Sequence, residues 1–379
     1  MSESRQARPA ATRMPVRRSA VVPEPAEGYD VVVGHGVLDE VPRMLGEAPE
    51  RVAVCYAEPL SGLAERVIAQ LHAYEVLRLE LPDGEVGKTG PVALAAWERL
   101  GAAGFTRSDA VVTVGGGATT DMGGFIAATW LRGVRVVHVP TTLLAMVDAA
   151  VGGKTGMNTS AGKNLVGSFH EPAGVVCDLD LLGTLPEPEL IAGLGEVVKC
   201  GFIADPEILA LVERCPADAL EPRSGELREL VERAIAVKIA VVQEDLRETG
   251  GRDGHPGREV LNYGHTMAHA IEKATQYAVR HGEAVALGMV YVAELARLAG
   301  RLDDEVAARH ASVLASVGLP VRFAGASFEE LLATMRIDKK ARGSRLRFLV
   351  LDGLARPAIL TDPSEDLLRA AYEHLAGAR

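Results

Sequence analysis

Apolar and polar positions follow different patterns in the two halves of the chain. Before about residue 185, short apolar runs rich in valine recur at 29–33, 51–55, 110–114 and 134–139. Near-continuous apolar runs are typical of parallel strands that are buried on both faces. The stretches 60–71 and 91–101 lie between these runs and have helical spacing. The first half therefore predicts strands and helices that alternate around a parallel sheet.

The second half has the pattern of a helical domain. Its apolar positions recur at helical spacing in segments rich in Ala, Leu, Glu and Arg. A proline-containing junction at 184–188 separates the halves, so we expect one domain over 19–185 and an all-α domain over 186–379. The glycine-rich stretch 249–257 is predicted to be a loop. The expected helices are 187–201, 206–214, 226–247, 265–277, 282–299, 303–317, 327–336 and 364–376.

Residues 1–18 are rich in Arg, Ala, Ser and Pro. The arginines leave a transit peptide as one interpretation, but the segment lacks the continuous apolar core of a secretory signal. We expect a disordered tail over 1–18.

Composition and charge narrow the possible functions. The chain has 379 residues, 48% of them hydrophobic, and a formal net charge of −11. This charge argues against a nucleic-acid partner that is bound through a broad basic surface. No apolar run approaches the roughly 18 to 20 residues that a bilayer span needs, so no membrane partner is expected. The four cysteines have no CxxC spacing, which favours reduced thiols and a cytoplasmic location.

The segments NYGHTMAH (262–269), HGE (281–283) and GEVVK (195–199) carry the most informative chemistry. Two or three imidazoles with a carboxylate from separate helices make a catalytic zinc site with one open position. His265 and His269 would share a helix face, so both could reach one metal ion. The spacing leaves the ligands open among His265, His269, His281 and Glu196. Surface or capping histidines are the alternative, but the apolar run at 284–289 indicates burial.

The strand expected at 110–114 leads directly into Gly115, Gly116 and Gly117. Glycines between a strand and a helix start suit a pyrophosphate, because bare backbone N–H groups lie beside a helix N-terminus. A tight turn is the alternative, since the motif is not GxGxxG. Polar groups after other strands favour NAD binding at the same sheet edge. These groups are Thr141, Thr142, Asp83, Glu85 and Lys88.

Several cations occur in segments where a solvated face is not expected. Lys154 and Lys163 lie in glycine-rich stretches near Asp148 and Asn164. Each cation alone is typical of an ordinary surface charge. Several together would give an acidic protein the local positive potential that a phosphate and a carboxylate require. Further candidates are Lys199, Lys238, Arg258 and the cluster DKK at 338–340.

In combination these segments resemble the 3-dehydroquinate synthase family of sugar phosphate cyclases, over nearly the whole chain from about 31 to 372. The resemblance implies an α/β Rossmann-like parallel-sheet domain, then an all-α metal-binding domain, usually in a homodimer. The motifs are GGGATTDMGGF (115–125), PTTLLAMVDAAVGGKTGMN (140–158), GKN (162–164), GLGEVVK (193–199), LNYGHTMAH (261–269), HGEAVALGM (281–289) and DKK (338–340).

The resemblance also implies a role for each matching residue. Glu196, His265 and His281 would hold Zn²⁺ or Co²⁺, and the anionic sugar-phosphate substrate would bind through its phosphate, carboxylate and hydroxyls. The phosphate matches Lys154, Asn164, Asn262, His269 and Lys339, with Arg132 from the neighbouring subunit. The carboxylate matches Lys238 and Arg258, and the hydroxyls match Asp148, Lys199 and Glu248. The NAD contacts match Asp83, Glu85, Lys88, Gly115, Gly116, Gly117, Asp121, Thr141, Thr142, Lys154, Lys163 and Thr184.

The implied reaction converts 3-deoxy-D-arabino-heptulosonate 7-phosphate into 3-dehydroquinate and phosphate. It combines transient oxidation with NAD, phosphate elimination, re-reduction and an intramolecular aldol closure. The chain departs from the family pattern at Thr120, where many relatives have glycine, and in the longer loop at 249–257. Arg252 in that loop is an alternative to Arg258 as carboxylate partner, and His255 is expected to be a loop residue.

Three other functions compete with this one. Other sugar phosphate cyclases, including aminodehydroquinate synthase, share the motifs, although Lys238 with Arg258 favours a substrate that bears a carboxylate. A metal-dependent alcohol or glycerol dehydrogenase would transfer a net hydride, but it has no need of phosphate-binding residues. A non-catalytic paralogue is disfavoured because the expected catalytic positions are filled.

Overall fold

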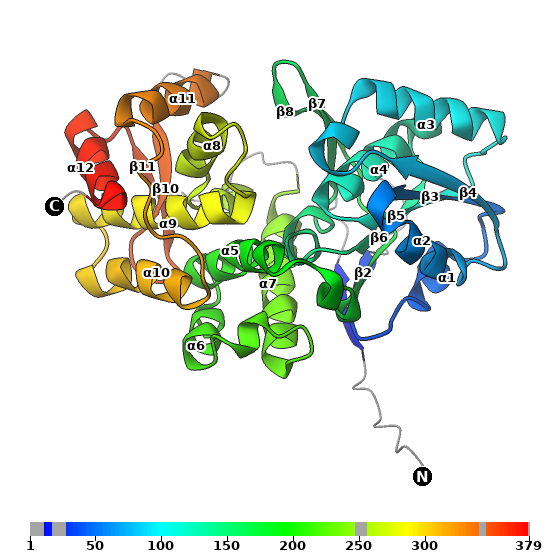
Figure 1. The fold of residues 1–379 in the computed structure, drawn as a ribbon, viewed down its shortest axis with the longest axis horizontal. Coiled ribbons are helices and arrows are strands. Elements are labelled where there is room, and N and C mark those ends of the chain that lie inside the picture. Colours follow the sequence, from blue (N-terminus) through cyan, green and yellow to red (C-terminus); the bar gives the residue numbers. More distant parts are fainter. Residues whose placement is uncertain (1–10, 17–27, 247–255, 341–345, 378–379) are drawn as a thin grey trace, which may run out of the picture. The chain divides into compact units, whose positions relative to one another are not determined.

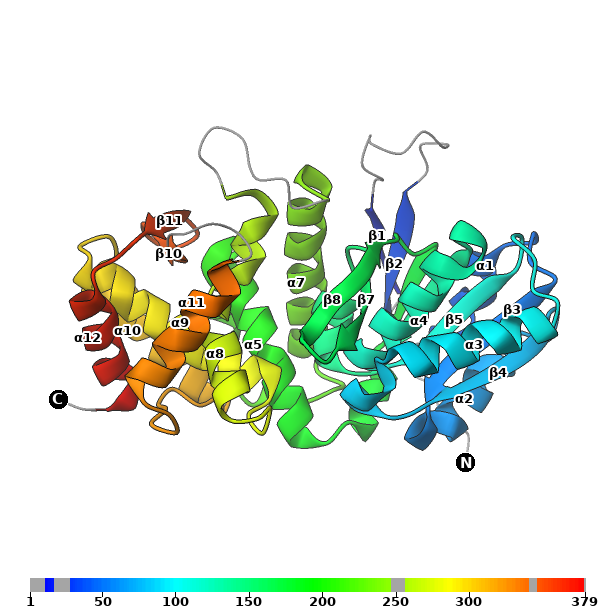
Figure 2. The same ribbon diagram turned by 90° about the horizontal axis from the view of Figure 1, so that it is seen from above.

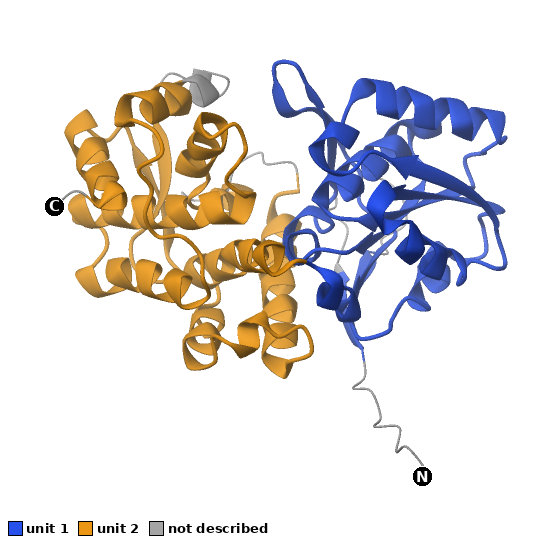
Figure 3. Ribbon diagram, in the orientation of Figure 1, with its two compact units in different colours: residues 1–185 blue, residues 186–379 orange. Residues whose placement is uncertain are grey.

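The computed structural model describes residues 11–16, 28–246, 256–340 and 346–377, with backbone alone for 337–340 (Figures 1 and 2). The chain divides into two compact units, Met1–Leu185 and Pro186–Arg379 (Figure 3). Each unit is described by itself. Within the described ranges, the helices are all too short or too polar to cross a membrane.

The first unit is built on a seven-stranded sheet with the order β1-β2-β9-β6-β5-β3-β4. Five of the six neighbouring pairs are parallel, and the β1–β2 pair is antiparallel. The α/β fold class expected from the valine-rich runs is confirmed. The strands are β1 (Thr12–Val16), β2 (Tyr29–Gly34), β3 (Arg51–Ala57), β4 (Glu75–Leu81), β5 (Ala110–Gly115), β6 (Arg135–Pro140) and β9 (Gly174–Asp178).

Strand β1 corrects the expectation of a disordered tail over 1–18. Residues 12–16 pair with 29–33, and Arg13 also contacts Glu40 and Asp30. The pairing gives hydrogen-bond partners to backbone N–H and C=O groups at the edge of β2. Amino-acid composition alone does not reveal such a pairing. Residues 1–10 and 17–18 of the expected tail lie outside the described residues.

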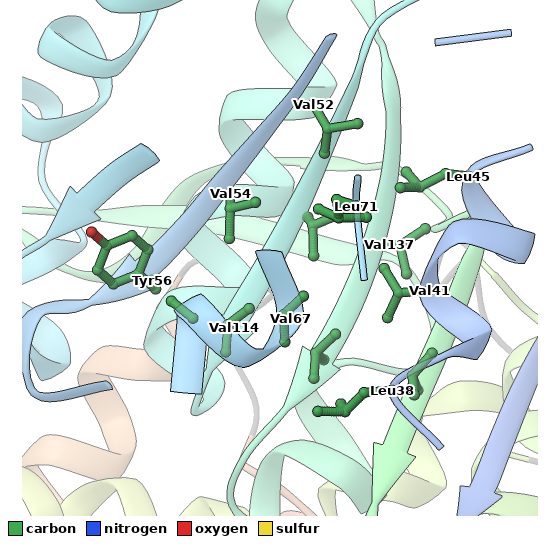
Figure 4. Packing of buried hydrophobic residues seen from close by; sticks show 14 of the residues in the cluster. Leu38, Val41, Leu45, Val52, Val54, Tyr56, Val67, Leu71, Val114 and Val137 are labelled. Atoms are coloured by element: carbon green, nitrogen blue, oxygen red, sulfur yellow. The ribbon is translucent and has the colours of Figure 1, made fainter. Parts of the chain in front are cut away.

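Helices cover both faces of this sheet, and alternate strand residues point to opposite faces. Val52 and Val54 belong to the core beneath α1 and α2, which Figure 4 shows from close by. Ala53 and Cys55 belong to the other core, beneath α3 and α4. Burial on both sides explains why the strands read as continuous apolar runs. The helices are α1 (Glu40–Leu45), α2 (Ser61–Ile68), α3 (Gly90–Ala102) and α4 (Gly117–Thr129).

Short turns and one hairpin complete the first unit. β7 (Lys154–Thr159) and β8 (Gly162–Phe169) form an antiparallel pair beside α4 (Figure 2). The short helical segments are η1 (Glu58–Leu60), η2 (Gly84–Gly87), η3 (Trp130–Arg132), the π-helix η4 (Ala145–Ala149) and η5 (Leu179–Thr184).

The second unit is helical and is organised around α9 (His281–Leu298) (Figure 1). This helix is buried from residue 282 to 296 except at Glu283, because its side chains are mostly small or apolar on every face. It packs on α5, α8, α10, α12 and strand β10. The other helices are α5 (Glu187–Ile203), α6 (Pro206–Arg214), α7 (Gly225–Glu244), α8 (His265–Ala274), α10 (Asp304–Ser316), α11 (Phe328–Lys340) and α12 (Glu365–Ala376).

A hairpin modifies the expectation that the second unit is purely helical. β10 (Arg347–Leu351) pairs antiparallel with β11 (Pro357–Thr361), and the buried side of β10 packs against α9. Two short turns, η6 (Asp218–Leu220) and η7 (Gly257–Asn262), connect the helices.

Candidate metal centre and nucleotide site

Three ligand-type side chains of the second unit meet at one point. Glu196 lies within α5, while His265 and His281 are the first residues of α8 and α9. The Nε2 atoms of both imidazoles lie 3.6 Å from the same oxygen, Glu196 Oε1. One donor atom from each of the three residues lies within 4.8 Å of the others. The structure thus brings together one carboxylate and two imidazoles from three separate helices.

Glycines beside the three ligands let these helices approach closely. Gly195 precedes Glu196 and Gly282 follows His281, and a Cβ on Gly195 would meet the Gly282 carbonyl oxygen. Gly264 has φ +79°, and a Cβ there would come within 2.8 Å of the backbone nitrogen of Met289. Side chains at these positions would push α5 and α8 away from α9. The close backbone contacts therefore set the spacing of the three ligands.

The second donor atom of each ligand is held by a neighbouring group. Lys199 donates hydrogen bonds to Glu196 Oε2 and to the Leu261 carbonyl, the latter at 2.6 Å. His265 Nδ1 lies 3.1 Å from the Tyr263 carbonyl, and His281 Nδ1 lies 3.3 Å from Glu272 Oε1. A carbonyl and a carboxylate only accept hydrogen bonds, so both Nδ1 atoms carry the proton. Nε2, the nitrogen directed toward Glu196, is therefore the atom that each ring offers to a metal ion.

The electrostatics of the two imidazoles differ. Burial and the nearby Lys199 cation hold the pKa of His265 well below its usual value, so this ring is neutral. Burial also lowers the pKa of His281, but hydrogen bonds to Glu196 and Glu272 outweigh it and raise the pKa to about 10. The donor set, one carboxylate oxygen and two imidazole nitrogens, fits a Zn²⁺ ion with three protein ligands. Binding of such an ion would release the proton of His281.

His269 lies outside this donor set. It is exposed on α8, one turn after His265, and the two rings are 5.5 Å apart in an edge-on arrangement. The rings of His265 and His281 are 5.2 Å apart. Helical spacing alone allowed either His265 or His269 as a ligand. In the structure, His265 is the one of the two that belongs to the donor set with Glu196.

A buried pair that the sequence did not indicate supports the backbone before α8. The Tyr263 hydroxyl lies 2.9 Å from His310 Nε2, and His310 Nδ1 lies 2.8 Å from the Val306 carbonyl. Since that carbonyl only accepts, the Tyr263 hydroxyl donates to His310. His310 also stacks on Phe202, with ring centroids 3.6 Å apart. These contacts fix the residue whose carbonyl orients His265.

Two buried cations lie on packed elements of the same unit. Arg258 in η7 is only 1% exposed, and its Nη1 donates to the Leu246 carbonyl at 2.7 Å. Lys238 is buried on α7, which packs against η7. Asn262 ends η7 and lines a narrow cavity with Gly264 and Phe348. The side chain of Lys339 on α11, and all of Glu248, Arg252 and His255, lie outside the described residues.

In the first unit, the glycine cluster sits where β5 passes into α4. Gly115 ends the strand, Gly116 is the N-cap and Gly117 is the first helical residue. A Cβ on Gly116 would lie 3.2 Å from Thr142, so a side chain there would crowd the next strand end. Thr120 is buried and donates to the Gly117 carbonyl at 3.0 Å. Its hydroxyl is therefore bound within the first turn of α4.

Lys88 joins three segments of the first unit. Its buried ammonium donates to Asp121 Oδ2 on α4 at 2.7 Å and to Asn164 Oδ1 on β8 at 2.5 Å. Burial raises the pKa of Asp121 to about 6, although Lys88 opposes the shift. Asn158, which the sequence did not single out, donates to Glu85 Oε2 at 2.6 Å and accepts from the Asn164 backbone.

The remaining nucleotide candidates follow neighbouring strand ends. Thr141 and Thr142 follow β6, and the Thr141 backbone donates to the Gly115 carbonyl at 3.0 Å. Asp148 lies in η4 and is close enough to Asp121 to raise its pKa. The other candidates are Asp83 before η2, Lys154 at the start of β7, Lys163 in β8 and Thr184 at the end of η5.

Arg132 lies away from the glycine turn of its own chain. It is exposed in η3, after the C-terminal end of α4, whereas Gly117 begins that helix. A helix of this length separates its two ends by roughly 18 Å.

The fold and the two sites define a two-domain class of protein. An α/β domain has a glycine-rich turn of the kind that binds nucleotides, and a helical domain follows with a buried set of metal-ligand residues. Family models described as 3-dehydroquinate synthase N-terminal and C-terminal match residues 78–192 and 193–341. The chain belongs to the 3-dehydroquinate synthase family.

Individual relatives agree with this assignment. A 3-dehydroquinate synthase of Thermobifida fusca (strain YX) is 58% identical over 351 residues, which are 92% of this chain and 94% of the relative. The solved structure of ValA, a 2-epi-5-epi-valiolone synthase of Streptomyces hygroscopicus subsp. jinggangensis 5008 with NAD⁺ and Zn²⁺ bound, has a TM-score of 0.84 at 26% identity, covering 96% of this chain and all 100% of that one. A 2-deoxy-scyllo-inosose synthase complexed with carbaglucose-6-phosphate, NAD⁺ and Co²⁺ has a TM-score of 0.83 at 26% identity, with 96% and 100% coverage.

Proposed function

We propose that this protein is a 3-dehydroquinate synthase that uses NAD and a divalent metal ion, Zn²⁺ or Co²⁺. It converts 3-deoxy-D-arabino-heptulosonate 7-phosphate into 3-dehydroquinate and inorganic phosphate, as a phosphate-eliminating lyase of the shikimate pathway. The observation that carries the proposal is the buried set Glu196, His265 and His281, in a chain 58% identical to a 3-dehydroquinate synthase.

Each unit contributes a different part of the chemistry. Bound NAD supplies a reversible hydride acceptor, and a bound metal ion supplies a Lewis acid that acidifies a coordinated hydroxyl. Glu196, His265 and His281 hold the ion, and their engaged second donor atoms keep them oriented toward it. In the first unit, the bare N–H groups at Gly116 and Gly117 receive the pyrophosphate of the nucleotide.

Cations supply the binding energy for an anionic substrate. We assign the substrate carboxylate to Lys238 and Arg258, which are both buried. A buried guanidinium binds a carboxylate strongly because its donors form a rigid fork in a poorly solvated place. The phosphate is assigned to Lys154, Asn164, Asn262, His269 and Lys339, and the hydroxyls to Asp148, Lys199 and Glu248.

The test is incubation of the purified protein with the heptulosonate phosphate, NAD and Zn²⁺. Phosphate and 3-dehydroquinate are expected in equal amounts, with no lasting accumulation of NADH. Continued NADH formation would instead favour an alcohol or glycerol dehydrogenase. Turnover of an amino analogue or of a heptulose 7-phosphate without carboxylate, in place of the expected substrate, would favour another sugar phosphate cyclase.

We further propose a homodimer in which Arg132 serves the neighbouring subunit. Leu131 and Arg132 have φ values of +48° and +68°, which are strained for residues with a Cβ. Leu131 is exposed, and so are Leu165 and Phe169 on β8. Phe169 precedes His170, whose ring lies beside Gly133, so exposed apolar side chains flank the strained turn and support a protein interface there.

Hybrid dimers test this assignment. Co-expression of Arg132→Ala with His269→Ala should give hybrids in which one site has both wild-type residues, so activity is regained. If Arg132 acts within its own chain, neither site of the hybrid is intact and no activity returns. Light scattering should show a dimer for both parents.

A cytoplasmic location is also proposed. Its support is the state of Cys55, Cys177, Cys200 and Cys215, which are thiols and form no disulfide with one another. Fractionation of the source cells should recover the protein with cytoplasmic markers.

A further inference from the structure

The carboxylate of Glu272 lies against the metal-centre histidine of another helix. Glu272 is on α8, seven residues after His265, and is buried. Its Oε1 lies 3.3 Å from Nδ1 of His281, the first residue of α9. The helix that supplies one ligand therefore also supplies a group that orients the next. None of the sequence motifs pointed to Glu272.

The two imidazoles are held by chemically different acceptors. His265 meets a neutral backbone carbonyl, while His281 meets a carboxylate. A carboxylate that accepts the Nδ1 proton fixes the ring tautomer and makes Nε2 a stronger electron donor than a carbonyl does. It also adds a negative charge close to the ion. The Lys199 cation donates a hydrogen bond to Glu196 and offsets its negative charge. The carboxylate of Glu272 therefore supplies negative charge that a divalent cation needs.

We propose that Glu272 is a positioning residue of the metal centre. Its carboxylate accepts the Nδ1–H of His281, turns Nε2 toward the ion, and raises the affinity for a divalent cation without ligating it. This inference rests on the metal site proposed above and adds a residue to it.

The test compares metal affinity among isolated variants by competition of Zn²⁺ with a chromophoric chelator. Glu272→Ala should bind Zn²⁺ about 10- to 100-fold more weakly than wild type. Glu272→Gln keeps an oxygen that accepts the same hydrogen bond but loses the charge, so its affinity should lie between the two. The matched control is Glu294→Gln, because Glu294 is a buried carboxylate of α9 that pairs with Arg297 at 2.8 Å.

A spectroscopic measurement separates positioning from a general loss of stability. Loaded with Co²⁺, Glu272→Gln should have a visible absorption spectrum shifted from wild type, while Glu294→Gln should match wild type. Wild-type affinity and spectra in both Glu272 variants would overturn the inference. An equal loss of affinity in Glu294→Gln would overturn it too. If wild type itself binds no Zn²⁺, it is the proposed metal site that fails.

Discussion

Lys199 and Glu196 form a buried ion pair within one turn of α5. The ammonium of Lys199 donates a hydrogen bond to Oε2 of Glu196, and Oε1 faces the imidazoles of His265 and His281. The carboxylate is thus held in its orientation by a side chain one turn further along the same helix. This arrangement makes the stability of the metal-free protein depend on Lys199.

Replacing Lys199 with methionine should therefore destabilise the metal-free protein. Removing one partner of a buried ion pair typically costs about 3 to 5 kcal/mol, because the other charge stays buried. Urea unfolding with and without Zn²⁺ measures the effect, and the ion should restore part of the loss. Lys273→Met on the exposed side of α8 is the control. Equal unfolding curves for the two variants would contradict the expectation.

Metal affinity should differ among alanine variants of the three histidines in this region. His265→Ala and His281→Ala should each lose more affinity than the roughly 10- to 100-fold that removal of an outer partner costs. His269→Ala should retain its metal, because that exposed ring is outside the donor set. Metal content after dialysis gives the result. A metal-free His269→Ala protein would mean that the ligand set is wrong.

The close crossing of α5 and α9 should be sensitive to a single methyl group. Gly282→Ala would place a Cβ against the Ala192 carbonyl and force the helices apart. Overpacking of this kind typically costs about 1 to 3 kcal/mol, and metal affinity should fall as the ligands separate. Thermal unfolding and metal titration measure both effects. Gly225→Ala serves as control, since a Cβ there meets nothing within 4 Å.

Acid should destabilise the first unit through His138. Burial lowers the pKa of this imidazole to about 3, and its Nδ1 lies 2.8 Å from Thr113 Oγ1. The unfolded chain takes up a proton below about pH 6.5, whereas the folded chain does not. The stability from neutral His138 is therefore complete above pH 6.5 and is lost as the pH falls toward 3.

Between pH 7 and 4.5 this group should remove about 2 to 3 kcal/mol of stability. Over the same pH range, the free energy of unfolding of His138→Asn should fall by about 2 to 3 kcal/mol less than that of wild type, as measured by urea unfolding. Thr113→Val keeps the titrating ring and should retain the wild-type pH dependence. Parallel pH curves for wild type and His138→Asn would exclude this role.

The sequence pattern predicted most elements of regular structure, because the periodicity of apolar positions is a property of the local sequence. The segment 206–214 was expected as a helix and is α6 with the same bounds. Strand β4 was not expected, because EVLRLEL alternates at the sheet edge and offers no continuous apolar run. The hairpin β10–β11 was missed as well, and β1 depends on pairing with the edge of β2.

The site was predictable only in part. The spacing of residues along the sequence narrowed the candidate ligands to three histidines and one carboxylate. It does not reveal the direction in which each imidazole ring points. Glu272, Tyr263 and His310 act through contacts between helices, such as the 2.9 Å contact between Tyr263 and His310. A pairing of this kind becomes visible only once the helices are packed together.

The contacts of Gly195 with Gly282, and of Gly264 with Gly288, also bear on how this core can change during evolution. Where main chain rests directly on main chain, any Cβ would separate the two helices, whatever the side chain beyond it. The four glycines are therefore expected to vary less among relatives than the side chains beside them.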